Sequence, residues 1–141
     1  MTVIGPFDGE YRFLSNFFAS SVVLDGEEYP SVEHAYQAAK TLVHSEQQQI
    51  KLAETPGKAK RLGRRVTLRS DWENVKIDVM ARLVKQKFVS HSELTTKLLA
   101  TGEAYLVEFN NWHDSFWGCS DGYGENHLGQ ILMQTRNELR S

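Results

Sequence analysis

Three side chains between residues 31 and 40 have types and spacing that suit catalysis. Glu33, Gln37 and Lys40 follow one another at intervals of four and three residues, so a helix would place a carboxylate, an amide and an amine on one face. A rise of about 1.5 Å per residue separates the Glu33 and Lys40 backbones by roughly 10 Å, which suits opposite ends of a sugar-sized ligand. The plainer interpretation is a first-turn acid favoured by the helix dipole and a solvated lysine, and periodicity alone favours it.

The segment from Glu108 to Gly118 is a second candidate site. It combines the carboxylates of Glu108 and Asp114 with several aromatic rings in a stretch that has no helical or strand periodicity. Rings can stack on a flat base, while carboxylates can hold ribose hydroxyls or move protons. Alternatively, Trp117 and its neighbours fill the core under a loop and the two acids hold turns. The sequence leaves both interpretations open.

A run of cations extends from Lys58 to Arg65 and on to Arg69, with no acid in between. Its functional interpretation is phosphate recognition by Arg61, Arg64 and Arg65, because clustered cations create a local positive field. Its structural interpretation is a solvated face. The run contains no aromatic residue, so it lacks the stacking platform of single-strand binders.

The composition excludes several other kinds of site. The formal net charge of −2 gives no whole-molecule attraction to nucleic acid or to an anionic membrane. The five histidines form no zinc pattern, Cys119 is the only cysteine, and the glycines match no nucleotide-binding fingerprint, so we expect no metal and no cofactor. The single cysteine and the lack of a membrane-length apolar run predict a soluble, cytoplasmic protein.

A hairpin and a helix are expected to position the first candidate site. Asp25-Gly26 tolerates the positive φ of a tight turn, and the residues around it predict a hairpin over residues 22–29. Ser31 then stands where an N-cap should, before a helical pattern over residues 32–42. That helix carries the Glu33, Gln37 and Lys40 face.

Two further helices are expected before residue 90. The first is short and polar, with Ser45 as its cap, Gln48 closing a capping box and an end before Pro56. The second is the core helix, because apolar residues recur at helical spacing from Trp72 to Phe88.

The remaining sequence predicts a helix, a strand, a loop and a last helix. Apolar positions around residues 94–99 favour a helix that ends at Gly102, and residues 105–107 favour a brief strand. Residues 110–124 have the composition of a loop. Asn126 is positioned to cap the final helix.

Six ordered blocks of this sequence resemble the NADAR protein family and cover most of the chain. They are residues 13–17, 31–40, 72–88, 106–108, 117–118 and 126–133. The stretches LSNF, EHAYQAAK and NHLGQILM are the most characteristic. Residues 119–125 depart from the glycine-richer run that family members often have.

The resemblance implies hydrolysis of N-glycosidic bonds by a mainly α-helical domain over residues 1–141 with a small β-hairpin, or alternatively an α+β domain. Two substrate classes follow from it: ribosylaminopyrimidine phosphates from early riboflavin synthesis, and ADP-ribose attached to guanine. The partner would thus be a phosphorylated ribosyl molecule, with nucleic acid only as an ADP-ribosylated substrate. A rival of another class is a non-catalytic module that binds ADP-ribose. Oligomeric state cannot be read from the sequence.

The resemblance also implies roles for individual residues. Lys40 would form a Schiff base with the ring-opened ribose, and Glu33 and Glu108 would transfer protons or stabilise the electron-poor C1. The pocket would be shaped by Asn16, Phe17, Tyr36, Trp72, Lys87, Asp114, Trp117 and Asn126.

Overall fold

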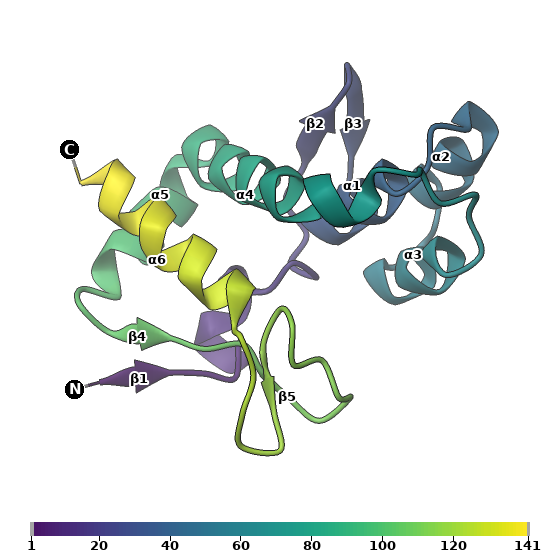
Figure 1. Ribbon diagram of the computed structural model, residues 1–141. Helices are drawn as coiled ribbons and strands as arrows, with labels where there is room; N and C mark the ends of the chain where they lie inside the picture. Colours follow the sequence, from purple (N-terminus) through teal and green to yellow (C-terminus); the bar gives the residue numbers. More distant parts are fainter. Residues whose placement is uncertain (1, 141) are drawn as a thin grey trace. The chain divides into compact units, whose positions relative to one another are not determined.

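The computed structural model describes residues 2–140 (Figure 1). They form two compact units. One unit is Asn16–Lys87, and the other combines residues 2–15 with residues 88–140. Six α-helices, one 3₁₀ helix and six short strands among the described residues confirm a mainly α fold with small β elements. The expected single domain stays a prediction. No helix within residues 2–140 is both long and apolar enough to cross a membrane.

The hairpin of the Asn16–Lys87 unit forms where the turn pattern predicts it. Strand β2 (Val22–Leu24) pairs antiparallel with β3 (Glu27–Tyr29). Asp25 and Gly26 adopt positive φ values of 50° and 81°, as the two central residues of a tight hairpin turn require. The hairpin prediction is confirmed.

Helix α1 (Val32–Ala39) is buried along its whole length. Ser31 caps it as predicted, because its Oγ accepts a hydrogen bond from the His34 N–H at 3.1 Å. The His34 ring ties the helix to Ala53, further along the chain. Its Nε2 atom lies 3.0 Å from the Ala53 carbonyl and must donate to it, so Nδ1 accepts from the Ser31 hydroxyl at 2.7 Å. The helix ends at Ala39 and places Lys40 at its C-cap.

Helix α2 (His44–Lys51) is the expected polar helix, but its predicted cap is wrong. The N-cap position is occupied by Val43 and has no side-chain cap bond, so Ser45 lies inside the first turn. The acid of that turn, Glu46, instead accepts hydrogen bonds from the hydroxyls of Thr41 and Thr67, at 2.6 and 3.0 Å. These longer-range bonds decide where the helix starts.

Helix α3 (Pro56–Gly63) contains much of the cationic run and was not predicted as a helix. Thr55 caps it, accepting from the Lys58 N–H at 3.1 Å, and Pro56 occupies its first turn, where the missing proline N–H costs nothing. Both α2 and α3 pack against α1. The cations of α3 are therefore held on a helix surface beside the candidate site.

Helix α4 (Trp72–Ser90) is the predicted core helix. Its buried apolar side chains are Trp72, Val79, Met80, Leu83, Val84 and Phe88. The part up to Lys87 belongs to the Asn16–Lys87 unit, and Phe88 begins the second segment of the other unit.

The unit of residues 2–15 and 88–140 pairs elements that are distant in sequence. Strand β1 (Val3–Ile4) lies parallel to β4 (Tyr105–Leu106) (Figure 1). Strand β5 (Phe109–Asn110) lies parallel to β6 (Cys119–Ser120). The helical elements are η1 (Gly9–Leu14), α5 (Ser92–Ala100) and α6 (His127–Leu139). The last two helices and the strand near residue 105 are confirmed. Strand β1, η1 and the β5–β6 pair were not predicted.

Asn126 occupies the N-cap position of α6 but does not cap it with its side chain. Its Oδ1 accepts from the Glu108 N–H at 3.0 Å, and its Nδ2 donates to the Leu106 carbonyl at 2.9 Å. The predicted capping role is wrong because Leu106 and Glu108 offer backbone partners to both ends of the amide. Asn126 therefore fixes the backbone around Glu108.

Candidate functional site

Glu33 and Gln37 are joined on the buried face of α1. The Gln37 Nε2 atom donates a hydrogen bond to Glu33 Oε2 at 2.6 Å. Gln37 is 3% exposed and Glu33 is 7% exposed. Lys40 lies one turn further along and is half-buried. The predicted common face is therefore present, and Glu33 is more than a solvated first-turn acid.

Aromatic rings line the helix face beside Lys40. The Lys40 Nζ atom lies 5.7 Å from the centroid of the Tyr36 ring, within the range of a cation–π contact. Tyr36 packs against Trp72 of α4, with ring centroids 5.2 Å apart. Both rings are buried, so they form a fixed apolar wall next to the amine.

The electrostatic surroundings of Lys40 make it a better nucleophile than an exposed lysine. Burial lowers the pKa of Lys40, Glu33 opposes this, and the charges of Lys60, Arg64 and Lys76 lower the pKa further. A lower pKa leaves more of the amine neutral near pH 7, and only the neutral amine can attack a carbonyl carbon.

Asn16 and Phe17 lie at the start of the same unit. The Asn16 carbonyl accepts from the Glu33 N–H at 3.1 Å, and its Nδ2 donates to the Met80 sulfur at 3.4 Å. Asn16 is therefore a buried link between α1 and α4. Phe17 is 43% exposed, which leaves part of its ring accessible to a ligand.

Lys87 is a second lysine with unusual surroundings. It is 1% exposed, and its Nζ atom lies 5.6 Å from the centroid of the Phe18 ring. Burial lowers the pKa of Lys87 to about 7, so its charge changes in the physiological pH range. The family resemblance assigns Lys87 to the pocket, but nothing in the sequence indicates that burial lowers the pKa of its amine.

The three arginines assigned to phosphate binding lie on two faces of the α3 region. Arg64, together with Lys60, acts on the charge of Lys40. Arg61 and Arg65 line a separate cavity of about 390 Å³ with Lys58. Arg64 is therefore close enough to Lys40 to affect its charge, whereas Arg61 and Arg65 share the cavity with Lys58.

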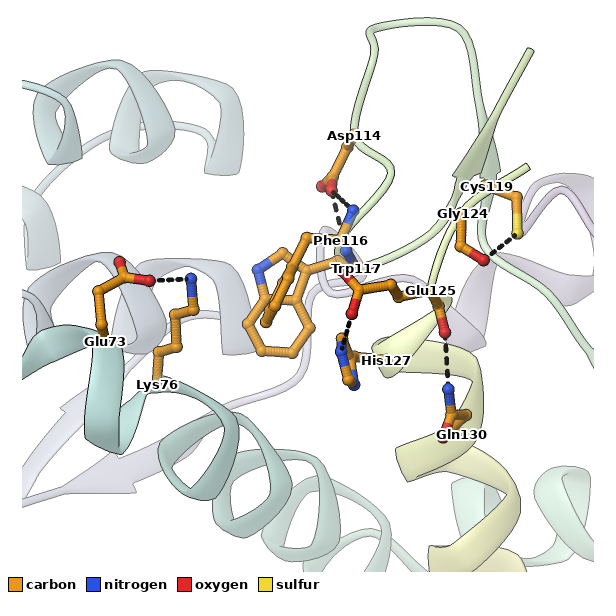
Figure 2. Close-up of polar contacts among 10 residues, drawn as sticks. All are labelled: Glu73, Lys76, Asp114, Phe116, Trp117, Cys119, Gly124, Glu125, His127 and Gln130. Atoms are coloured by element: carbon orange, nitrogen blue, oxygen red, sulfur yellow. Dashed lines mark hydrogen bonds and ion pairs between the residues drawn. The ribbon is translucent and has the colours of Figure 1, made fainter. Parts of the chain in front are cut away.

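The aromatic loop between β5 and α6 is organised by Asp114, as Figure 2 shows. Asp114 Oδ1 accepts from the backbone N–H groups of Phe116 and Trp117, at 3.1 and 2.9 Å. The Phe116 ring packs against the His127 ring at a tilt of 41°, with centroids 4.4 Å apart, and meets Trp117 edge-on at 4.9 Å. Asp114 and Trp117 thus have structural roles, and their contact with a substrate stays a prediction.

Glu108 is half-buried at the end of the β4 segment. Its backbone N–H is held by Asn126, and Asn110 Nδ2 lies 3.4 Å from its carboxylate Oε2. A Cβ atom on Gly118 would lie 2.0 Å from the Glu108 carbonyl oxygen, so only glycine permits this approach. The second candidate acid therefore sits on a well-supported backbone, in the unit of residues 2–15 and 88–140.

Three residues around Lys40 were not assigned to the site from the sequence. Lys60 precedes Arg64 by four residues. On a helix this spacing places two side chains on the same face, but the sequence analysis did not predict α3. Lys76 follows Trp72 by the same interval on α4, and its Nζ donates to Glu73 at 2.7 Å (Figure 2). Gln37 shared the predicted face of α1 but had no assigned role.

Comparison with known proteins gives a consistent result. The family model of the NADAR domain matches residues 5–140 of this sequence. The N-glycosidase YbiA of Escherichia coli (strain K12) is 40% identical over 133 residues, which cover 92% of this chain and 82% of that protein. The NMR structure of the E. coli protein YbiA matches 99% of this chain and 85% of that chain, with a TM-score of 0.86 and 38% identity.

A longer relative combines this region with other sequence. A riboflavin biosynthesis protein of Vibrio vulnificus (strain YJ016) is 40% identical over 136 residues, which cover 94% of this chain. The chain spans only 37% of the length of that protein.

Proposed function

The chain belongs to the NADAR domain family, and from this membership we propose that it is an N-glycosidase acting on ribosylaminopyrimidine 5′-phosphates, intermediates of riboflavin biosynthesis. Relatives named as an N-glycosidase and as a riboflavin biosynthesis protein support the reaction and the pathway. The observation that carries the proposal is the buried α1 face, where the carboxylate of Glu33 acts on the charge of the half-buried Lys40 amine.

The proposed reaction uses Lys40 as the nucleophile. Its neutral Nζ adds to C1 of the ring-opened ribosylamine, and the C1–N bond to the pyrimidine amine breaks as that amine takes up a proton. This exchange leaves a Schiff base between Nζ and C1. Water then adds to C1, the Nζ–C1 bond breaks, and ribose 5-phosphate leaves with the lysine amine restored.

Glu33 would assist both halves of this sequence. Positive charge develops on C1 and Nζ when the leaving amine departs, and a nearby carboxylate lowers the energy of that charge. The same carboxylate can take a proton from the attacking water. The influence of Glu33 on the Lys40 charge supports this placement.

The remaining groups on this face suit the two ends of the substrate. Lys60 and Arg64 supply cations for the 5′-phosphate close to Lys40, and an arginine can hold phosphate through two hydrogen bonds. The Tyr36 and Trp72 rings supply apolar surface for the pyrimidine. Asn16, Phe17 and Lys87 would complete the contacts within this unit.

Residues of the other unit enter the proposal on the strength of the sequence and the family resemblance. Glu108 is proposed as a second carboxylate for proton transfer, and Asp114, Trp117 and Asn126 as pocket residues. Replacement of Glu108 by glutamine tests its part directly, because the amide keeps the size and removes the proton-accepting charge.

A second substrate class, ADP-ribose attached to guanine, has one observation in its favour. The cavity lined by Lys58, Arg61 and Arg65 could take an additional phosphate that a ribose 5-phosphate lacks. Incubation of the chain with each substrate, followed by chromatography, distinguishes the two. Free ribose 5-phosphate supports the proposal, free ADP-ribose supports the alternative, and ligand binding without product would indicate a binding module.

A further inference from the structure

Gln37 is a buried amide that connects the proposed catalytic acid to helix α3. It lies one helical turn after Glu33, and its Nε2 atom donates to Glu33 Oε2 at 2.6 Å. A hydrogen bond to a carboxylate is strongest when the carboxylate is ionised, because the charge strengthens it. Both residues are buried, so little solvent competes for the contact.

The other end of the amide is pressed against Gly63, the last residue of α3. A Cβ atom at position 63 would lie 1.9 Å from Gln37 Oε1 and 2.7 Å from its Cδ. Such contacts are not possible, so any side chain at position 63 would displace the Gln37 amide from its present place. The helix backbone thereby blocks any displacement of the amide toward α3.

The amide has one usable orientation. A rotation of half a turn would place Oε1 against the Glu33 carboxylate, and two acceptors repel one another. In the orientation present, Oε1 is buried and has no hydrogen-bond partner among residues 2–140. An unsatisfied buried acceptor is unfavourable, and an apolar side chain of equal length would avoid it. The N–H donor is therefore the feature of this amide that an apolar side chain of equal length would lack.

We propose that Gln37 is a positioning residue that holds the Glu33 carboxylate ionised and in one orientation on the face shared with Lys40, with Gly63 as the support that fixes the amide. This inference rests on the proposed catalytic role of Glu33. It adds to that role a requirement on two residues that do not touch the substrate.

Gln37→Met tests the proposal, since methionine keeps the length of the side chain and lacks the N–H donor. We expect kcat to fall about tenfold to a hundredfold, the scale for loss of a hydrogen bond to a charged group, with a smaller change in KM. The acidic limb of the kcat/KM profile should move to higher pH, because an ionised Glu33 loses the donor that stabilises it. An unchanged kcat and an unchanged limb would refute the inference.

A double-mutant cycle separates positioning from a general packing effect. In the Glu33→Gln background, Gln37→Met should change the residual activity less than about twofold, because contacting residues that act through one another are non-additive. An equal loss in both backgrounds would show that Gln37 acts independently of Glu33. If Glu33→Gln itself keeps full activity, the role of Glu33 fails; if only Gln37→Met is harmless, the positioning inference alone fails.

Two glycines of α3 provide a matched pair of substitutions. Gly63→Ala should displace the amide and lower kcat about tenfold, while the helix content measured by circular dichroism is retained. Gly57→Ala is the control, because its nearest neighbour would be Thr55 Oγ1 at 3.9 Å, and activity should stay within about twofold of wild type. Equal activities of these two folded variants would contradict the support role of Gly63.

Discussion

Replacement of Glu33 by glutamine separates the chemical role of this acid from its structural one. The new amide has nearly the same volume, and its Oε1 can still accept the hydrogen bond that Gln37 donates to Glu33. What is lost is the charge: a neutral hydrogen bond is weaker than a charge-assisted one by about 1 kcal/mol. For a chain of this length we expect Tm to fall by roughly 2–5 °C.

The effect on turnover should be much larger than the effect on stability. We expect kcat to fall at least about a hundredfold, the usual scale for a lost acid or base. Loss of the carboxylate should also lower the pKa of Lys40, because Glu33 is the group that opposes the lowering by burial. The pH at which Lys40 becomes reactive should therefore move down while turnover falls.

The assay compares steady-state kinetics and thermal unfolding of Glu33→Gln with those of Glu28→Gln, an exposed acid on β3. The control variant should match wild type in both measurements. If Glu33→Gln turned over at the wild-type rate, the acid would have only its helix-dipole role, and the proposed mechanism would lose its C1-stabilising group.

Three other predictions concern phosphate binding, stability and the second acid. Neutralising Lys60 and Arg64 should raise KM about tenfold and weaken the salt dependence of KM. Neutralising Arg61 and Arg65 should leave the KM for a ribosyl 5′-phosphate substrate nearly unchanged. Equal KM changes for the two double variants at several ionic strengths would contradict this division. Asn126→Ala should lower the free energy of unfolding in urea by about 2–4 kcal/mol, because two backbone groups near Glu108 lose their partners, and a loss below about 0.5 kcal/mol would place it among ordinary surface changes. Glu108→Gln should lower kcat about tenfold or more without a comparable loss of stability, and an unchanged kcat would restrict Glu108 to the backbone of its loop.

The elements that the sequence predicted are those with a local cause. Ser31 caps α1 through its own third neighbour, and Asp25-Gly26 makes a turn that needs no distant partner. The core helix was evident because its apolar positions repeat every three or four residues over nineteen residues. The common face of Glu33, Gln37 and Lys40 was predicted from the same spacing of three or four residues.

The features that the sequence missed depend on partners far along the chain. Strand β1 exists because Val3 pairs with Tyr105, about a hundred residues away, and α2 begins where Thr67 holds Glu46. Such contacts leave no periodic signal. Helix α3 has no apolar periodicity to predict it, because its residues are mostly cationic, small or glycine. Its position depends on packing against Gln37.

In the candidate site, too, local sequence patterns predicted some features, while others depend on the tertiary structure. Residue types and spacing identified the Lys40 face, but the distribution of the cations over two faces follows only from the position of α3. The lowered pKa of Lys87 follows from burial, which depends on the packed tertiary structure. Asn126 was assigned to the right position with the wrong partner, because both ends of its amide bind backbone around β4.

The central claim, that Lys40 is the nucleophile of an N-glycosidase, is tested most directly by trapping with borohydride during turnover of a ribosylaminopyrimidine 5′-phosphate. Borohydride reduces a Schiff base to a stable amine, so peptide mass spectrometry should find a ribose-derived mass on the peptide that contains Lys40. Lys40→Arg should abolish the adduct, because a guanidinium stays protonated and cannot attack. An adduct on Lys87 would move the nucleophile to the other perturbed lysine, with a yield that rises through about pH 7. Turnover with no adduct on any lysine would contradict the Schiff-base route and favour direct attack of water assisted by Glu33 or Glu108.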